Sequence, residues 1–286
     1  MITDGGLATD LEAHGHDLSD DLWSARLLHD DPDAIRDVHR RFFDAGADFA
    51  TTASYQASYD GFARRGIDRS TATKLMRRSV TLAREAAQET GRTSFVAASI
   101  GPYGACLADG SEYRGGYGLT KRQLADWHRP RIETLLDADP DLVAVETIPD
   151  IDEAEAILDV LEHLDAQAWL SYTIDKTSTR AGQALTDAFA LAADAPQVVA
   201  VGINCCVPED VSPAIEIARK ATGKPTIVYP NAGEQWDATA KRWLGPKRFT
   251  AELAGTWDAE IVGGCCRVSP ADIAAVTRAI KGSAAE

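Results

Sequence analysis

The run Val198-Val199-Ala200-Val201-Gly202-Ile203 is apolar without interruption, and the polar pair Asn204-Cys205 follows it directly. A strand with one solvated face alternates apolar and polar residues, whereas a strand buried on both faces is continuously apolar. Both faces of a strand are buried in a parallel sheet that helices cover. We therefore interpret 198–204 as a strand of such a sheet.

The same pattern recurs along the chain. Comparable runs lie at 48–54, 94–100, 141–146, 167–173, 225–230 and 260–264, and helical patterns follow the seven runs at roughly 70–90, 120–138, 152–164, 186–194, 210–222, 247–256 and 270–281. A first strand near 1–4 and a helix near 31–45 bring the count to eight strand–helix units. Eight units in 286 residues predict an α/β protein with a (β/α)8 TIM-like barrel. A doubly wound open sheet is the alternative, but no G-x-G-x-x-G follows the first strand.

Composition and charge limit the domain organisation, the partners and the location that we expect. No linker rich in Pro, Gly or Ser divides the chain, so we expect a single domain over 1–286. The net charge of −15 argues against a nucleic-acid partner, and no stretch approaches the ~20 apolar residues that a membrane span needs. The N-terminus lacks the features of a signal peptide, which predicts a cytoplasmic location. The Gly-rich segment 101–119 is too long for a mere connector and is typical of a functional loop.

Polar or metal-binding residues end almost every predicted strand. They are Asp4, Ser54, Gly101-Pro102, Glu146, Tyr172, Asn204-Cys205, Tyr229-Pro230-Asn231 and Gly264-Cys265-Cys266. In a barrel these ends converge on one mouth, where barrel enzymes place their chemistry. We therefore expect these residues to lie together although they are far apart in the sequence.

The cysteines at that mouth predict a zinc site. The odd total of five cysteines argues against a disulfide framework, and adjacent cysteines are too close to pair. Thiolates suit Zn²⁺, which in catalytic sites takes three protein ligands and leaves a fourth position open. One strand end offers Cys205 or Cys206, and the last offers Cys265 and Cys266, where Gly263-Gly264 allows the chain to bend. The alternative, that cysteines are buried as small apolar side chains, fits Cys106 better than these two pairs.

Two carboxylates at strand ends suggest the substrate. Asp4 and Glu146 either cap helices and make structural hydrogen bonds or hold the ammonium group of a substrate. Ser54 is either a turn residue or a hydroxyl contact. None of the six histidines lies at a predicted strand end, which argues against a thiol hydrolase that needs a base beside its nucleophile.

The chain resembles the homocysteine S-methyltransferase family over nearly its whole length. The motifs that carry the resemblance are Asp4-Gly5-Gly6, Asp21-Leu22-Trp23-Ser24-Ala25, Thr52-Ala53-Ser54-Tyr55-Gln56-Ala57-Ser58, Gly101-Pro102-Tyr103-Gly104-Ala105, Gly110-Ser111-Glu112-Tyr113-Arg114-Gly115, His128-Arg129-Pro130-Arg131, Glu146-Thr147-Ile148-Pro149, Gly202-Ile203-Asn204-Cys205, Tyr229-Pro230-Asn231-Ala232-Gly233-Glu234 and Gly263-Gly264-Cys265-Cys266-Arg267. The resemblance implies a (β/α)8 barrel with zinc bound by Cys205, Cys265 and Cys266. It also implies homocysteine binding by Asp4, Glu146 and Ser54.

We therefore predict an enzyme of methionine biosynthesis. It would transfer a methyl group from a sulfonium donor, S-methylmethionine or S-adenosylmethionine, to the thiolate of L-homocysteine, with Zn²⁺ as cofactor and small molecules as its partners. Betaine as donor in the same fold is one alternative. A zinc-binding or redox-sensing protein without turnover is another, and it would need the thiols but neither Asp4 nor Glu146.

Overall fold

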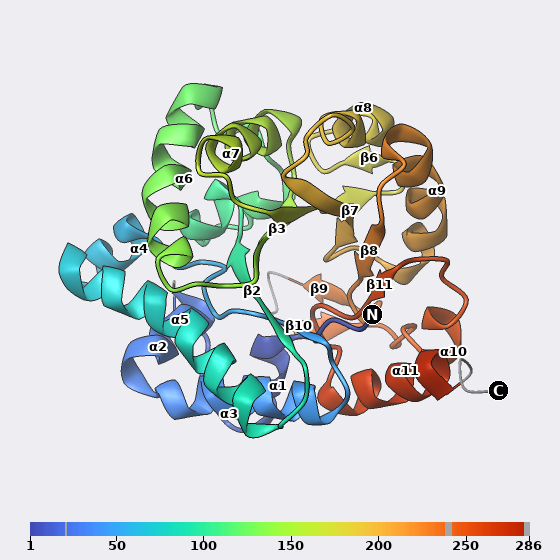
Figure 1. The fold of residues 1–286 in the computed structure, drawn as a ribbon, viewed down its shortest axis with the longest axis horizontal. Helices are drawn as coiled ribbons and strands as arrows, with labels where there is room; N and C mark the ends of the chain where they lie inside the picture. The colour runs from blue at the N-terminus through green and yellow to red at the C-terminus, as the bar shows by residue number, and fades with distance from the viewer. Residues whose placement is uncertain (21, 238–241, 283–286) are drawn as a thin grey trace.

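The computed structural model describes residues 1–20, 22–237 and 242–282. Asp21, the first residue of one quoted motif, lies outside the described residues. A sheet of seven parallel strands runs through the centre of the molecule in the order β1-β2-β3-β4-β7-β8-β11 (Figure 1). Its strands are β1 (Phe49–Thr51), β2 (Phe95–Ile100), β3 (Leu142–Ile148), β4 (Ala168–Tyr172), β7 (Val198–Asn204), β8 (Thr226–Tyr229) and β11 (Ile261–Val262).

The N-terminal residues connect the two edges of this sheet. Ile2 forms a parallel bridge with Val262 of β11, and Thr3 forms one with Phe49 of β1. Both N-terminal residues are fully buried. The strand that we expected near 1–4 is thus present only as isolated bridges, because it is too short to build a ladder of its own.

Eight helices alternate with the strands and lie on the outside of the curled sheet (Figure 1). They are α3 (Pro32–Asp44), α5 (Arg69–Glu89), α6 (Lys121–Leu136), α7 (Ile151–His163), α8 (Leu185–Ala190), α9 (Val211–Thr222), α10 (Ala251–Ala254) and α11 (Pro270–Gly282). Local sequence sets their ends. Asp31 caps α3 by accepting a hydrogen bond from the Ala34 N–H, and Thr120 forms a capping box with Gln123 at the start of α6. The seven predicted strands and the helices between them are confirmed.

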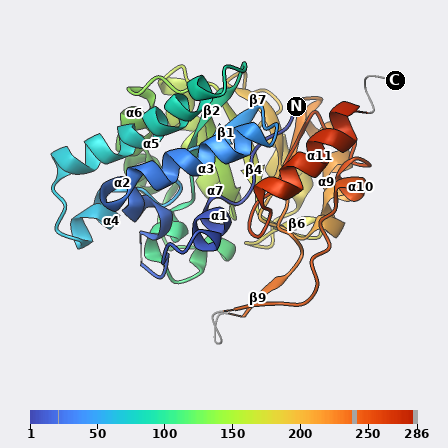
Figure 2. The ribbon, with the colours of Figure 1, turned by 90° about the horizontal axis from the view of Figure 1, so that it is seen from below.

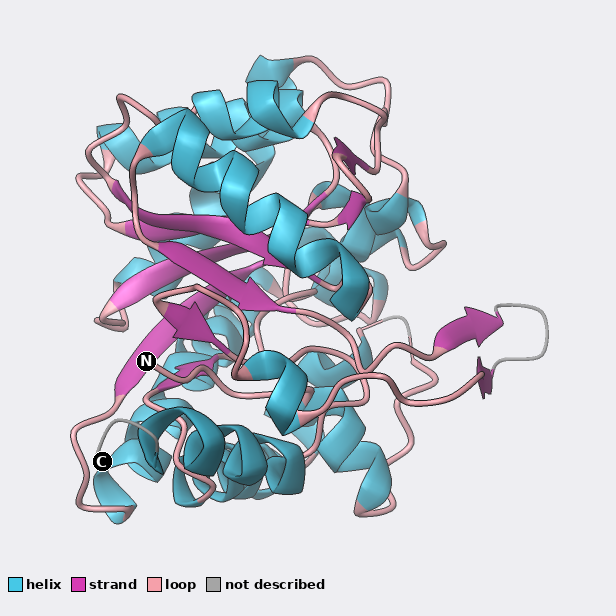
Figure 3. Ribbon diagram, turned by 90° about the vertical axis from the view of Figure 1, so that its right-hand side faces the viewer, coloured by secondary structure: helices cyan, strands magenta, loops and turns pink. Residues whose placement is uncertain are grey.

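Several short elements were not predicted. They are α1 (Leu7–Ala13), η1 (Trp23–Arg26), α2 (Leu27–Asp30), α4 (Tyr59–Arg64), η2 (Tyr103–Leu107), η3 (Ser111–Tyr113), η4 (Pro208–Asp210) and the hairpins β5 (Ile174–Asp175) with β6 (Ser178–Thr179) and β9 (Gln235–Asp237) with β10 (Arg242–Leu244). The β9–β10 hairpin projects away from the rest of the molecule (Figures 2 and 3). Within the described part of the chain, none of the helices combines the length and hydropathy that crossing a bilayer requires.

The apolar core has two parts. The larger part involves both the strands and the helices, and it includes Phe42, Phe43 and Phe62, all fully buried. The smaller part is drawn mainly from strand residues, among them Phe49, Trp169 and Tyr229, and Cys265 packs against it. Cys265, which is half-buried, therefore borders a packed apolar cluster.

Gly202 of β7 is required by the spacing of the sheet. A Cβ atom at this position would lie 1.7 Å from the carbonyl oxygen of Ile227 on β8. Because the backbone fixes the position of a Cβ atom and the carbonyl oxygen belongs to a buried neighbouring strand, no rotamer change can relieve the clash. We expect Gly202→Ala to lower the free energy of unfolding by at least about 3 kcal/mol, as chemical denaturation would measure. Gly182→Ala, in an open turn with a φ of +85°, is the contrasting variant and should cost on the order of 1 kcal/mol. Equal losses in both variants would contradict this account of the packing.

Candidate metal centre and substrate-binding residues

Three cysteine side chains converge at the carboxyl ends of β7 and β11. The sulfur atoms of Cys205, Cys265 and Cys266 all lie within 4.8 Å of one another. Cys205 follows β7 directly, and the other two follow β11 after Gly263-Gly264. The predicted set of three is therefore brought together across 60 residues of sequence. Cys206 is buried beside Cys205 but is not part of this cluster, and neither is buried Cys106.

Backbone geometry turns Cys205 toward the other thiols. Its φ of 48° lies in the left-handed region, which costs a non-glycine residue free energy and is found mostly where function demands it. The Cys205 N–H donates to Tyr229 O (3.3 Å), and Thr173 Oγ1 donates to Cys205 O (3.3 Å). Hydrogen bonds on both sides of the residue therefore stabilise this conformation.

The role that we expected for Gly263-Gly264 needs a correction. β11 already ends at Val262, and neither glycine has a positive φ, so the bend does not use the conformational freedom of glycine. Space is the reason instead. A Cβ at Gly263 would lie 2.2 Å from Thr3 Cγ2, and one at Gly264 would lie 2.2 Å from Val268 Cγ1. The glycines allow the segment that carries Cys265 to lie against the N-terminal segment.

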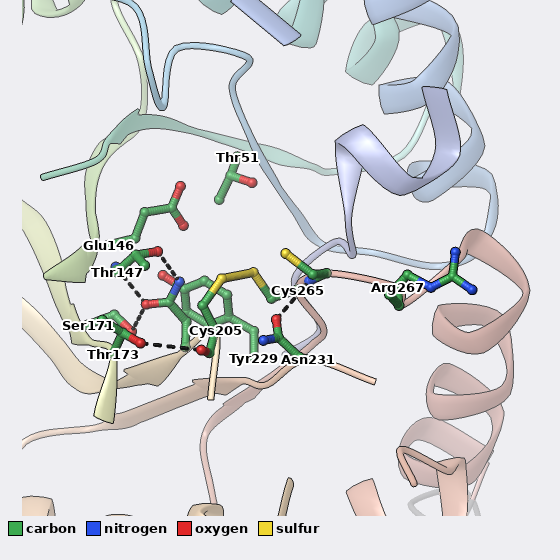
Figure 4. Close-up of a disulfide and its surroundings, with 12 residues drawn as sticks. Thr51, Glu146, Thr147, Ser171, Thr173, Cys205, Tyr229, Asn231, Cys265 and Arg267 are labelled. Carbon is green, nitrogen blue, oxygen red and sulfur yellow. Dashed lines mark hydrogen bonds between the residues drawn. A yellow bond between two sulfur atoms is a disulfide. The ribbon is translucent and has the colours of Figure 1, made fainter. Parts of the chain in front are cut away.

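A second correction concerns disulfides. Cys205 and Cys265 are joined by a disulfide, as Figure 4 shows, with their Cα atoms 5.7 Å apart. The odd count of cysteines and the adjacency rule did not exclude this pair, since its members are distant in sequence. The Cα separation of Cys205 and Cys265 lies within the ~4.4–6.8 Å range of disulfides. The same arrangement of the two residues is therefore compatible with a disulfide and with two sulfur atoms bound to one metal ion.

Asp4 is a buried carboxyl group beside this cluster. Only 2 % of the residue is exposed, and Oδ2 accepts a hydrogen bond from the Thr51 N–H (2.9 Å). Thr3 Oγ1 and Thr51 Oγ1 donate to Oδ1, each at 3.2 Å. Burial raises the pKa of Asp4 to about 8, and the charge of Glu146 adds to the shift. The strongest effect is desolvation, which a cationic ligand would offset.

Glu146 lies within β3 rather than at its end, because the strand continues to Ile148 through a bulge. Its carboxylate accepts hydrogen bonds from the hydroxyl groups of Ser99 and Tyr229. Burial raises the pKa of Glu146 to about 7 despite these bonds. Asp4 and Glu146 interact electrostatically, and Figure 4 shows Glu146 in the same region as Cys205 and Cys265.

The bulge at Glu146 is held by a residue that the sequence did not single out for this role. Asn204 Oδ1 accepts from the Thr147 N–H (2.7 Å) and from Ser171 Oγ (2.9 Å), and Asn204 Nδ2 donates to Thr147 Oγ1 (2.7 Å). Thr147 has a φ of 60°, so these bonds compensate for an unfavourable backbone. The Asn-Cys pair thus orients Glu146 with one residue and supplies a thiol with the next. Asn204 directly follows an apolar run and belongs to the Gly-Ile-Asn-Cys motif, but neither signal revealed this role.

Ser54 is fully buried, and its hydroxyl already has partners. Ser54 Oγ donates to Ser99 O (2.7 Å) and shares a hydrogen bond with Thr52 Oγ1 (2.7 Å). The Ser54 carbonyl oxygen accepts from Arg131 Nη2 (3.2 Å). These contacts place Ser54 in the framework next to Ser99, whose hydroxyl group donates to Glu146.

Arg131, from the His-Arg-Pro-Arg motif, forms hydrogen bonds with the segments that follow β1 and β2. It is 1 % exposed, and it also donates to Tyr55 O (2.9 Å) and Gly101 O (3.1 Å). We expect Arg131→Met to lower the free energy of unfolding by about 3 kcal/mol, because Tyr55 O and Gly101 O lose their donor and Ser54 O keeps the Ala57 N–H alone. Urea denaturation of this variant and of Arg129→Met, a change in the half-buried arginine of the same motif, would measure the difference. Equal stabilities of the two variants would refute this role.

Comparison with known proteins agrees with this geometry. The homocysteine S-methyltransferase family model matches residues 1–280. This chain belongs to that family. A homocysteine S-methyltransferase of Escherichia coli is 46 % identical, with 96 % of this chain and 94 % of the relative aligned.

Solved structures of a relative show the same fold. The metallated form of the homocysteine methyltransferase MmuM from Escherichia coli superimposes with a TM-score of 0.87 at 43 % identity, covering 99 % of this chain and 96 % of that one. The oxidized form of MmuM gives a TM-score of 0.86 at 44 % identity, covering 97 % and 94 %. As a member of the homocysteine S-methyltransferase family, this chain is a methyltransferase that acts on small molecules.

Proposed function

We propose that this methyltransferase is zinc-dependent and moves a methyl group from S-methylmethionine or S-adenosylmethionine to the thiolate of L-homocysteine, giving methionine. The observation that carries the proposal is the convergence of three thiols beside two buried, electrostatically coupled carboxyl groups. Thiols alone would suit a structural metal site. The added carboxylates favour a site that also binds an amino acid.

The thiol cluster fits a zinc ion. Zn²⁺ with Zn–S bonds of ~2.3 Å in a tetrahedron holds its sulfur ligands about 3.8 Å apart, and the three sulfur atoms here lie within 4.8 Å of one another. Cys205, Cys265 and Cys266 would hold the ion once the sulfurs are reduced. Zinc bound there supplies a coordination position that keeps a substrate sulfur deprotonated at neutral pH.

Asp4 and Glu146 would bind the ammonium group of homocysteine. Both carboxylates are desolvated, and an ammonium group restores favourable interactions to their charged forms through charge-assisted hydrogen bonds. Ser54 Oγ retains a lone pair for a weaker contact, since its proton is donated to Ser99 O. Fixing the amino-acid end directs the substrate sulfur toward the thiols, and orientation of this kind contributes several kcal/mol to catalysis.

The architecture that we propose is one closed (β/α)8 barrel over 1–286, with the N-terminal residues as its eighth strand. The bridges from Ile2 to β11 and from Thr3 to β1 support closure. They also place Asp4 directly after this strand, at the same end of the sheet as the thiols. We further propose that the protein works in the cytoplasm, where thiols stay reduced.

A paired assay tests the proposal. Reduced protein with a measured zinc content is given homocysteine together with S-methylmethionine, S-adenosylmethionine or betaine, and methionine is quantified. We expect turnover with the first or second donor, with about one zinc per chain. The absence of methionine with all three donors would overturn the proposal.

The alternative of a zinc-binding or redox-sensing protein without turnover is not retained, because the chain belongs to a family of methyltransferases and carries buried Asp4 and Glu146 in addition to the cysteines.

A further inference from the structure

The loop that follows β2 extends over the end of β3. The Gly116 N–H donates to Asp150 Oδ2 (3.1 Å), and a Cβ at Gly115 would lie 3.0 Å from Asp150 Cβ. Asp150 follows β3 by two residues, and η3 of the loop packs against β3 itself. These contacts hold the loop near Glu146, on the side where the substrates of the proposed reaction would meet.

Glu112, in the middle of η3, is the unexplained residue of this loop. The residue is half-buried, its Oε2 atom is enclosed, and no donor among the described residues forms a hydrogen bond with that oxygen. Burial raises the pKa of the Glu112 carboxyl. An enclosed acceptor without a partner costs free energy, and a ligand that donates a hydrogen bond to Oε2 would recover it.

The packing of η3 places Glu112 at the end of the sheet that carries the candidate site. η3 contacts β3, the strand that contains Glu146. Glu112 therefore approaches the site from the loop side, whereas Asp4 approaches from the N-terminal segment. Asp4 and Glu146 are assigned to homocysteine, which leaves Glu112 for the second substrate.

The chemistry of the donor decides which of its groups Glu112 contacts. A sulfonium or a quaternary ammonium has no N–H, so neither can donate a hydrogen bond to Oε2. The sulfonium charge also disappears during methyl transfer, and a carboxylate on it would stabilise the ground state over the transition state. A primary ammonium donates hydrogen bonds and keeps its charge throughout the reaction.

We propose that Glu112 binds the α-ammonium group of the methyl donor and so selects sulfonium compounds that are amino acids. This inference rests on the proposed function, because it assigns a second amino-acid subsite to the same reaction. Binding of this kind is equal in the ground and transition states, so it acts on KM of the donor and leaves kcat unchanged.

The test compares Glu112→Gln with the unmodified zinc-loaded protein. We expect KM for S-methylmethionine to rise at least tenfold, with kcat, KM for homocysteine and zinc content each within twofold. Dimethylsulfoniopropionate, a sulfonium without an ammonium group, should be an equally poor donor for both proteins. Glu112→Asp, which keeps the charge on a shorter side chain, should fall between the two.

Glu12→Gln is the matched control. Glu12 is an exposed carboxylate on α1, outside the loop, and its replacement should change KM for S-methylmethionine less than twofold. An unchanged donor KM in Glu112→Gln would overturn the inference, and so would an equal loss with dimethylsulfoniopropionate.

Calorimetric titration of S-methylmethionine into zinc-loaded protein measures binding of the donor without turnover. A tenfold weaker Kd in Glu112→Gln supports the subsite even if no methionine forms, and equal Kd values refute it.

Discussion

Cys265→Ala is expected to abolish metal binding and to reduce methionine formation at least about 10³-fold. The change removes one of three sulfur ligands and leaves two thiols, which hold Zn²⁺ far less tightly than three. Metal content after gel filtration should fall from about one zinc per chain to less than a tenth. The folded state should persist, because Cys265 lies at the border of the smaller apolar cluster and not within it.

Cys206→Ala is the matched control for this experiment. Cys206 is adjacent to Cys205 and is equally buried, but its sulfur is outside the cluster of three. Its replacement should leave both zinc content and turnover within about twofold. Loss of zinc in Cys206→Ala, or full retention in Cys265→Ala, would contradict the assignment of the ligands.

Asp4→Asn is expected to raise KM for homocysteine about 10- to 100-fold while zinc remains bound. The substitution keeps the size of the side chain but removes one of two charges that would bind the ammonium group, and a charge-assisted hydrogen bond contributes about 1.5–3 kcal/mol. Steady-state kinetics with homocysteine varied at saturating donor would measure the effect. An unchanged KM for homocysteine would contradict binding of its ammonium group by Asp4.

The same substitution should change how stability depends on pH. The pKa of Asp4 is about 8 in the folded protein against an ordinary value near 3.8, so the folded state binds the additional proton. The free energy of unfolding therefore falls as pH rises from about 4 to about 8. Asp4→Asn removes this contribution, and the variant should lose less stability than the unmodified protein between pH 5 and pH 8.5. Equal losses in urea titrations at these two pH values would contradict the raised pKa.

The sequence predicted the sheet well because its signal is local. Continuous apolar runs such as 198–203 favour a strand buried on both faces, and β7 follows this rule except at Val199, which is 38 % exposed. The polar residues after these runs also located the three thiols and the two carboxyl groups. Because the ends of parallel strands converge, residues that are far apart in the sequence could be predicted to form one cluster.

What the sequence did not predict depends on contacts between distant segments. Gly263-Gly264 suggested flexibility, but their role follows from the positions of Thr3 and Val268. Arg131 reads as an ordinary residue of an exposed helix until its three carbonyl acceptors are known. The Cys205–Cys265 disulfide likewise depends on a distance that spacing in the sequence does not encode.

The position of β11 determines when the three cysteines can meet during synthesis. A growing chain presents Cys205 first, and a further 60 residues must follow before Cys265 appears. Contacts of such long range form late in folding. The proposed zinc site is therefore completed only when β11 joins the sheet beside β8, and metal binding would follow the folding of the sheet. The supply of reductant and of zinc at that stage, more than translation itself, would then set the yield of the proposed zinc enzyme.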